Sequence, residues 1–259
     1  MNTNDNKLSP RWVALISSLV VAGIYISGWF FSPGWNWLFI VLLMFVFLIM
    51  LGIRTSGRPA GILINERKIM SLSRFQLVLW TLIILSAYAT MSLMRIKASV
   101  PDPLGIAIDW RLWALMGIST ASLVGTPLVY STKARKEPAD DKPIKDAAVS
   151  FGEDEKQVNK NREGVLYGNE NISDAAFTDM FEGDELKNTA FIDMAKVQMF
   201  FFSLIAALSY VVLILDIIVS KTPKELASLP VLPEGLIAIL GISHAGYLTN
   251  KTTDHTKVK

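Results

Sequence analysis

The chain has 259 residues, of which 51% are hydrophobic and only 19% charged, and its formal net charge is +2. A soluble domain of this length carries about a quarter charged residues, and a nucleic-acid-binding domain carries a clear basic excess. The absence of cysteine excludes disulfides, thiolate metal sites and cysteine nucleophiles. We therefore expect an integral membrane protein whose principal partner is the lipid bilayer, with no nucleic-acid partner.

Six apolar segments follow one another along the chain, each close to the ~20 residues that a membrane-spanning helix needs. They lie at residues 12–31, 37–53, 75–94, 112–131, 197–219 and 232–249. A Ser-Pro-Gly turn joins the first two into a hairpin, and the first is too long for a signal-peptide core, so we expect it to be retained. The sequence predicts an all-α fold, a polytopic membrane helical bundle with six transmembrane helices.

Loop charge predicts the orientation, because basic loops stay in the cytoplasm. Basic residues exceed acids between the second and third segments, directly after the fourth, and after the sixth. Both termini are therefore expected in the cytoplasm. The predicted parts are an N-terminal transmembrane hairpin (1–56), a first two-helix repeat (57–131), a charged linker (132–172), a second repeat with a preceding amphipathic segment (173–250) and a tail (251–259).

The stretch from Lys133 to Lys160 is polar and has no aromatic residue apart from Phe151, which favours a disordered or loosely held segment. The segment from Ser173 to Lys196 carries spaced apolar residues and is predicted to form short helices on a surface. Ser173 is the expected N-cap of the first of them. The whole cytoplasmic stretch, 132–196, is a possible binding site for a cytoplasmic protein partner.

Two parts of the chain share an ordered pattern of a basic residue, glutamine, aromatic, hydroxyl, tyrosine and Gly-Ile-Ser. The offsets are 198 − 76 = 122 and 241 − 117 = 124. Each copy contains two spans, so the copies have the same orientation and form a parallel duplication. The repeated polar residues are Gln76, Tyr88 and Ser119 in the first copy and Gln198, Tyr210 and Ser243 in the second.

The pattern Arg/Lys-x-Gln-x3-Trp/Phe-Thr/Ser, followed by a helix with Leu-(Met/Leu)-Gly-Ile-Ser, resembles a widespread group of bacterial multipass membrane proteins. In that group the same two helices recur twice. The resemblance covers residues 57–131 and 173–250, and the second copy, which continues as His244-Ala-Gly-Tyr-Leu248, follows the group more closely than the first. It implies a bacterial inner-membrane location and supplies no activity.

Small residues recur every four positions in both Gly-Ile-Ser helices. In lipid, close backbone approach along such faces drives helix association, so the two helices are expected to be the tightly packed, innermost pair. The helix-packing residues are Gly117, Ala121 and Gly125 in one helix and Gly241 and Ala245 in the other.

The depth of each tyrosine matches that of a serine on the next helix. We therefore expect one hydrogen bond between Tyr88 and Ser119 and another between Tyr210 and Ser243, because polar groups in hydrocarbon need partners.

The remaining polar candidates leave alternatives open. Gln76 and Gln198 either anchor span ends at the interface or form a ring at a pore mouth. Asp216 is an acid near the outer end of the fifth segment. It is either functional or close enough to the interface to reach water. His244 is expected to be a hydrogen-bonded packing residue rather than a pH sensor.

No catalytic motif, cofactor-binding loop or metal-ligand spacing is present in the sequence, so we expect neither enzyme activity nor a cofactor. The acidic run at residues 179–185 lacks EF-hand spacing and is expected to be solvated. Two functions remain in competition. The first is a homo-oligomeric channel or pore, which would require self-association; the second is a membrane anchor or sensor scaffold that recruits a cytoplasmic partner, with stress or phage defence as a possible setting.

Overall fold

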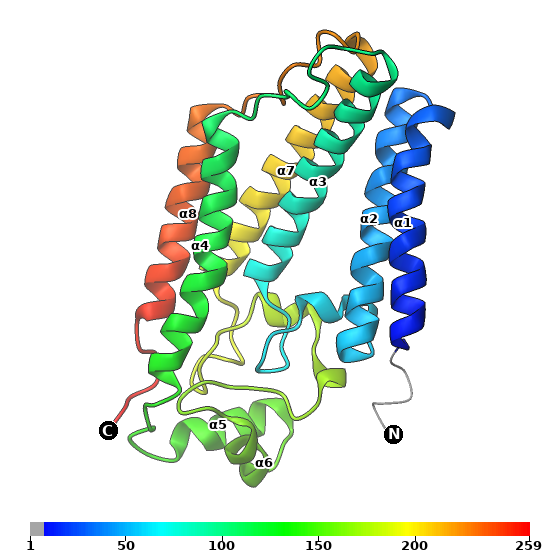
Figure 1. Cartoon of the computed structure of the whole chain (residues 1–259). Coiled ribbons are helices and arrows are strands. Elements are labelled where there is room, and N and C mark those ends of the chain that lie inside the picture. Colours follow the sequence, from blue (N-terminus) through cyan, green and yellow to red (C-terminus); the bar gives the residue numbers. More distant parts are fainter. Residues whose placement is uncertain (1–7) are drawn as a thin grey trace. The chain divides into compact units, whose positions relative to one another are not determined.

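The computed structural model describes residues 8–259, and within them the chain is helical with only isolated β-bridges. The main helices are α1 (Pro10–Phe30), α2 (Pro33–Ser56), α3 (Leu72–Lys97), α4 (Trp110–Lys133), α5 (Lys142–Phe151), α6 (Glu155–Asn161), α7 (Met194–Ser220) and α8 (Glu234–Thr252) (Figure 1). Short 3-10 helices are η1 (Pro59–Leu63), η2 (Ile172–Asp174) and η3 (Phe177–Met180). The prediction of an all-α polytopic bundle is confirmed.

Five helices, α1, α2, α3, α4 and α7, are long and apolar enough to cross a membrane. The sixth predicted span is present as α8 but is not among them. Its 19 residues include His244, Asn250 and Lys251, which lower its hydropathy. The helix was therefore predicted correctly, whereas its apolarity falls short of that of the other five.

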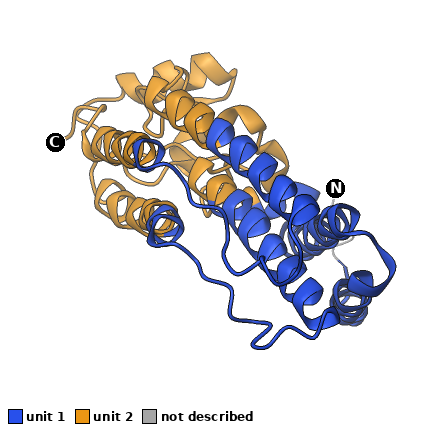
Figure 2. Cartoon of the chain, turned by 90° about the horizontal axis from the view of Figure 1, so that it is seen from above, with its two compact units in different colours: residues 1–62, 77–116, 204–237 blue, residues 63–76, 117–203, 238–259 orange. Residues whose placement is uncertain are grey.

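The chain forms two compact units, and the boundary between them falls inside α3, α4, α7 and α8 (Figure 2). The first unit comprises residues 1–62, 77–116 and 204–237. The second comprises residues 63–76, 117–203 and 238–259. Each unit has its own chemistry, and the two are described separately below.

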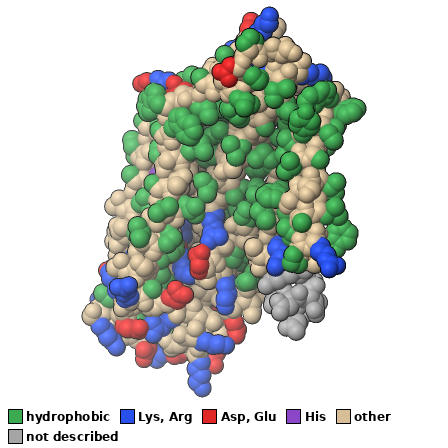
Figure 3. Space-filling view, viewed as in Figure 1, with side chains coloured by type: hydrophobic (Ala, Val, Ile, Leu, Met, Phe, Trp, Pro, Cys, Tyr) green, Lys and Arg blue, Asp and Glu red, His purple; other side chains and the backbone are tan. Residues whose placement is uncertain are grey.

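The first unit contains the α1–α2 hairpin and has an apolar core. Both helices of the hairpin begin with proline at the first position after a serine, where the missing amide proton costs nothing. Large side chains such as Trp37, Trp80, Ile84 and Tyr210 fill the core. Hydrophobic side chains also cover the outside of α1 and α2 (Figure 3). An apolar surface of this extent requires lipid or another protein around it.

Two loops of the first unit are fastened to each other and to the helices. Residues 107 and 228 pair as a parallel bridge, with the Ala107 amide donating to the Ala227 carbonyl at 2.8 Å. The buried Arg95 donates to three loop carbonyls, those of Asp102, Pro103 and Leu226. A guanidinium carries five donors, so this one side chain satisfies several carbonyl groups that the loops leave free.

The second unit contains the connecting module, which we define as residues 134–193, together with the adjoining helix ends. Within the module α5 and α6 pack on the following loop through Ile144, Ala147, Val158, Tyr167 and Leu186 (Figure 1). Charged side chains cover its outside (Figure 3). The prediction of a disordered or loosely held segment at 133–160 is therefore wrong, because its few apolar residues share one face and close a small core.

The predicted short helices after residue 172 are present as η2 and η3. The predicted N-cap is wrong, since Ser173 lies inside η2 and Asn171 precedes it. Phe151 stacks on Tyr167 with 4.8 Å between ring centroids, so α5 and the loop are also joined by an aromatic contact.

Candidate functional site

The centre of the second unit is a buried carboxylate, Asp184, in the loop before α7. Its Oδ1 accepts hydrogen bonds from Arg67 Nη2 at 2.7 Å, from the Tyr130 hydroxyl at 2.8 Å and from Lys196 Nζ at 3.2 Å. Lys251 Nζ lies 3.7 Å from Oδ2. These five residues, here called the ion cluster, come from the turn before α3, the loop and the ends of α4, α7 and α8.

The turn before α3 places Arg67 in the cluster. Lys68 adopts a positive φ of 60° and residues 64 and 70 pair, which closes a tight loop around Arg67. The guanidinium then donates from Nη1 to the carbonyls of Tyr167 and Asp184. It also lies over the Tyr130 ring at 4.2 Å, a contact that stabilises a desolvated cation.

Electrostatics keep Asp184 ionised although it is buried. Burial raises the pKa of a carboxyl, but the charges of Lys196, Lys251 and Arg67 and the Tyr130 hydrogen bond more than offset it, so the pKa of Asp184 lies well below its usual range. The pKa of Arg67 is raised, because Tyr130 and Asp184 outweigh its own desolvation. Asp184 and Arg67 are thus both charged at neutral pH.

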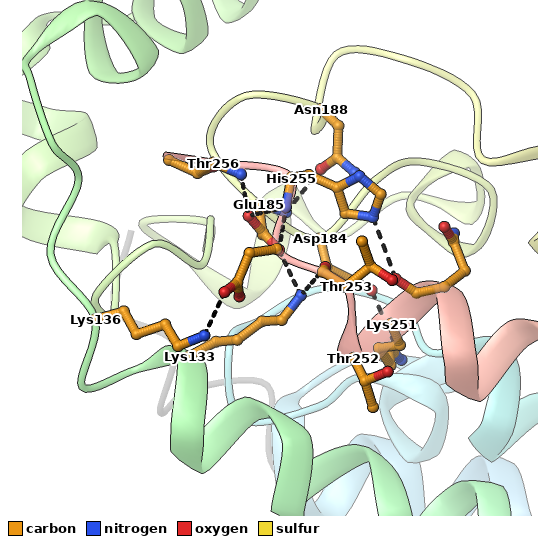
Figure 4. Close-up of polar contacts among 12 residues, drawn as sticks. Lys133, Lys136, Asp184, Glu185, Asn188, Lys251, Thr252, Thr253, His255 and Thr256 are labelled. Atoms are coloured by element: carbon orange, nitrogen blue, oxygen red, sulfur yellow. Dashed lines mark hydrogen bonds and ion pairs between the residues drawn. The ribbon is translucent and has the colours of Figure 1, made fainter. Parts of the chain in front are cut away.

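The neighbouring Glu185 forms a second centre (Figure 4). Its carboxylate contacts Lys133 Nζ at 2.5 Å and accepts from the backbone amides of His255 at 3.0 Å and Thr256 at 2.6 Å. The backbone amide of Glu185 donates a hydrogen bond to Asn188 Oδ1 at 2.9 Å. The C-terminal tail is therefore fixed to the module and to the end of α4. The expectation that the acidic run 179–185 is solvated is wrong for Asp184 and Glu185, which are both buried among cations.

The charges of this region balance. Two small hollows lie beside the ion cluster and Glu185. Four cationic side chains lie in this region, those of Arg67, Lys133, Lys196 and Lys251. Four carboxylates lie there as well, those of Asp179, Asp184, Glu185 and Asp193. The sum is 4 − 4 = 0. The region consequently needs no bound counter-ion. Each hollow has a volume of about 10 Å³, which is about enough for one water molecule.

A larger cleft of about 250 Å³ lies on the module side of Arg67. Burial raises the pKa of three carboxyls that line it, Glu153, Asp179 and Glu182. Tyr167 donates to Glu153 at 3.3 Å. Among residues 8–259 no group of three His, Cys, Asp or Glu side chains is placed to share a metal ion. The cleft is acidic, but its described residues do not form a metal centre.

The structure contradicts the predicted Tyr–Ser hydrogen bonds. The Tyr88 hydroxyl donates to the Leu104 carbonyl at 2.8 Å, and the Tyr210 hydroxyl donates to the Pro230 carbonyl at 3.0 Å. Ser119 and Ser243 make no side-chain hydrogen bond within residues 8–259. The reason is that the loop after each tyrosine-bearing helix folds back and offers a free carbonyl, which takes the phenol proton.

The two repeated glutamines differ in environment. Gln76 is fully buried, and its Nε2 donates to Ser203 Oγ at 2.6 Å and to the Met199 carbonyl at 3.4 Å. Gln198 is exposed. Gln76 therefore joins α3 to α7 and is not an interfacial anchor. The basic residue two positions before each glutamine also differs, since Arg74 pairs with Glu66 at the surface and Lys196 is in the ion cluster.

The predicted innermost faces of α4 and α8 are wrong for Gly117, Ala121 and Ala245, which are exposed. Gly125 and Gly241 are partly buried between the two helices, where an added Cβ would lie 3.6 Å from Leu248 and 3.8 Å from Ile118. A Cβ added at Gly117 would meet nothing within 4 Å, so no helix approaches closely there. Instead the polar faces of both helices are turned inward. This is the stable arrangement in lipid, where polar groups must find partners inside the protein and small apolar ones need none.

The inward polar faces leave several atoms without a partner in the described part of the chain. We call them the polar core: Gln76 Oε1, Ser119 Oγ, Ser122 Oγ, Ser243 Oγ and His244 Nε2. All five residues are more than nine-tenths buried. An unpaired buried group costs about 1–3 kcal/mol, so five would together cost as much as the whole stability of a typical domain, about 5–15 kcal/mol.

The two ionisable candidates are also placed. Asp216 is on the exposed side of α7, one turn from its end at Ser220. His244 is buried, and its Nδ1 lies 2.9 Å from the Leu240 carbonyl. The interpretation of His244 as a hydrogen-bonded residue is confirmed for Nδ1.

The sequence did not reveal the ion cluster. Arg67, Lys196 and Lys251 look like ordinary basic residues near span ends, which usually serve to set topology. The only signal in the sequence is that Asp184 and Glu185 follow a hydrophobic Met-Phe pair in a segment that returns to the membrane. That pattern does not identify the partners, which lie 12 to 117 residues away from Asp184.

No protein-family model, no curated protein and no solved structure matches the chain. The resemblance to bacterial multipass proteins therefore remains a prediction from the repeated motif. What the apolar helices do show is an integral membrane protein with a polytopic helical bundle.

Proposed function

We propose that the protein is a membrane anchor and sensor scaffold of a bacterial inner membrane, which displays the connecting module to the cytoplasm and recruits a protein partner there. The ion cluster carries this proposal. Its charges come from the loop of the module and from the ends of α4, α7 and α8. A change at the helix ends is thereby transmitted to the module.

Other contacts of the second unit support the proposal that the connecting module is coupled to the helix ends and not merely attached to them by flexible chain. Glu185 binds Lys133 of α4 and the backbone of the C-terminal tail. Asn250 of α8 donates to Asp193 at 2.9 Å, and Asp193 in turn accepts from the Ala195 amide at the start of α7. A buried charge that loses its partner is costly, so these contacts break together or not at all.

Hydrogen exchange in lipid nanodiscs tests the coupling. We expect Asp184→Asn to increase exchange in the module helices, residues 142–161, and in the last turns of α4 and α8 together. Asp146→Asn, at an exposed position of α5, is the matched control and should change nothing beyond α5. Faster exchange confined to residues 182–186 in Asp184→Asn would show that the module is not coupled to the helices.

The partner is tested in living cells with a photoreactive amino acid. Position 149 suits the purpose, because Val149 on α5 is 84% exposed and apolar. We expect a discrete protein adduct from position 149 that is lost in Asp184→Asn, and none from position 212 on the exposed face of α7. A membrane-inserted chain that gives no protein adduct at position 149 would refute a partner at this surface.

The topology is tested separately. The chain has no cysteine, so single cysteines can be introduced without further changes. Asp146→Cys should react with a membrane-impermeant maleimide only in opened cells, and Lys221→Cys, in the loop after α7, in intact spheroplasts. The reverse pattern would place the module outside the cytoplasm.

A homo-oligomeric channel is the second candidate, favoured by the exposed small residues Gly117, Ala121 and Ala245. Such faces allow close approach of another helix in lipid, and a second copy of the chain could supply it. The mass of the particle in detergent and ion flux into liposomes decide the matter. A monomer that carries no flux would eliminate the channel and leave the scaffold unaffected.

A further inference from the structure

The polar core of the second unit lies on three helices at matching depth. Ser73 of α3 and Tyr247 of α8 bring their hydroxyl oxygens to 3.5 Å. About one turn further along each helix are Gln76 and His244, which therefore lie at about the same level. Between α4 and α8, an added Cβ on Gly241 would lie 3.8 Å from Ile118. This contact sets Ser119 level with Ser243.

The polar core continues from the ion cluster without a break. Lys251 donates to the Tyr247 hydroxyl and to Thr126 Oγ1, the latter at 3.3 Å. Moving along α4 away from the ion cluster, Ser122 lies one turn beyond Thr126, and Ser119 lies nearly one turn beyond Ser122. Buried polar side chains thus succeed one another from Asp184 inward over about three turns of helix.

The hydrogen-bonding roles in the polar core can be assigned. His244 Nδ1 faces a carbonyl oxygen, so Nδ1 carries the proton and Nε2 is an acceptor in the neutral ring. The Gln76 amide nitrogen faces the Met199 carbonyl, so Oε1 is also an acceptor. The three serine hydroxyls can donate and accept. The site therefore offers acceptors and hydroxyls but no charge.

We infer that the polar core is a hydrated site, in which water molecules enter from the ion-cluster end and bind Gln76, His244 and the three serines. A small neutral molecule fits because the charges at the entrance pair with one another and sum to zero, so no net charge there favours a cation or an anion. Water supplies two donors for the acceptors and an acceptor for the hydroxyls. The hollow lined by Tyr130, Tyr247 and Lys251, with room for about one water, lies at the entrance.

Cysteine accessibility in liposomes tests the inference, because a thiol forms the reactive thiolate only in contact with water. Ser119→Cys and Ser243→Cys place thiols in the polar core. Thr120→Cys and Ile242→Cys are the matched controls, since each is the adjacent residue at the same depth on the exposed face. The probe is methyl methanethiosulfonate, which is small, neutral and crosses lipid.

We expect the two core thiols to be modified more than about tenfold faster than their neighbours, in proportion to their greater thiolate fraction. Equal rates at core and control positions would overturn the inference. Ser119→Ala and Ser243→Ala keep it testable if a cysteine variant fails to fold. Removing an unpaired hydroxyl from a dry core raises Tm, whereas removing a hydroxyl that binds water leaves Tm unchanged or lowers it; a rise in both variants would also overturn it.

Discussion

Asp184→Asn is the most informative single change, because it keeps the shape of the side chain and removes its charge. Arg67, Lys196 and Lys251 would then each lose the ion pair that they form with Asp184 in the described part of the chain. The amide NH2 of the new asparagine would also be a hydrogen-bond donor beside the groups that now donate to Asp184. The side chain of Asp184 is 12% exposed, so water screens little of this loss. Breaking a buried ion pair on one side costs about 3–5 kcal/mol.

The measurement is the free energy of unfolding in mixed detergent micelles, followed by the fluorescence of the seven tryptophans. Glu66→Gln is the control, because Glu66 pairs with Arg74 at 2.7 Å but is 79% exposed, and surface pairs are worth about 0–1 kcal/mol. Adding Lys251→Met to Asp184→Asn should restore part of the loss by removing one uncompensated cation. If Asp184→Asn costs no more than Glu66→Gln, the ion cluster does not stabilise the second unit.

Four further predictions concern the second unit. The folded-state pKa of Glu182 is raised, so its ionisation destabilises the fold at neutral pH, and stability should rise as pH falls through that pKa. Glu182→Gln should reduce the rise, and the remainder comes from Glu153 and Asp179, whose pKa values are also raised. The pKa of Asp184 is depressed, so its contribution is complete above its unfolded value of about 3.9 and is lost at still lower pH, as acid unfolding would record. Gly164→Ala should lower the stability measured by thermal unfolding more than Gly152→Ala does. Both glycines have a positive φ (61° and 66°), but only at Gly164 would the added Cβ meet a backbone oxygen, at 2.4 Å. Gly152→Ala should cost about 1–2 kcal/mol of stability. Ile144→Ala, in the core of the module, should cost about 2–5 kcal/mol and expose residues 134–193 to limited proteolysis.

The membrane helices could be predicted from sequence because their formation is dictated locally. Peptide groups in hydrocarbon must bond within the segment, so an apolar run of sufficient length fixes both the type and the approximate ends of a helix. The N-terminal hairpin is an example, with Pro10 and Pro33 marking its two helix starts. The last helix was located equally well, but its inner face is polar, so its hydropathy is lower than that of the other long helices.

The connecting module was missed although part of its signal was present. Ile144, Ala147 and Ala148 have the i, i+3, i+4 spacing of a helix with one buried face. Their number is small and charged residues surround them, so composition alone indicated disorder. The core closes only through Tyr167 and Leu186, and no local pattern ties those residues to α5.

The site could not be predicted for a different reason. The hydrogen bonds of Asp184 reach Arg67 across 117 positions and Tyr130 across 54, and single-sequence reasoning has no access to such distances. Assigning the small faces of α4 and α8 to the interior failed because a membrane helix can equally turn its polar side inward. The competing demand came from polar side chains of the same two helices, among them Ser119, Ser243 and His244, which are all buried.

The two joined loops of the first unit have a practical consequence for reagents. Residues 98–109 and 221–233 are shaped by mutual pairing, by Arg95 and by the phenols of Tyr88 and Tyr210. A free peptide copied from either loop lacks those constraints and adopts other conformations. Antibodies raised against such peptides should recognise the denatured chain on a blot and fail on native membranes, whereas binders selected on the folded protein should require both loops at once.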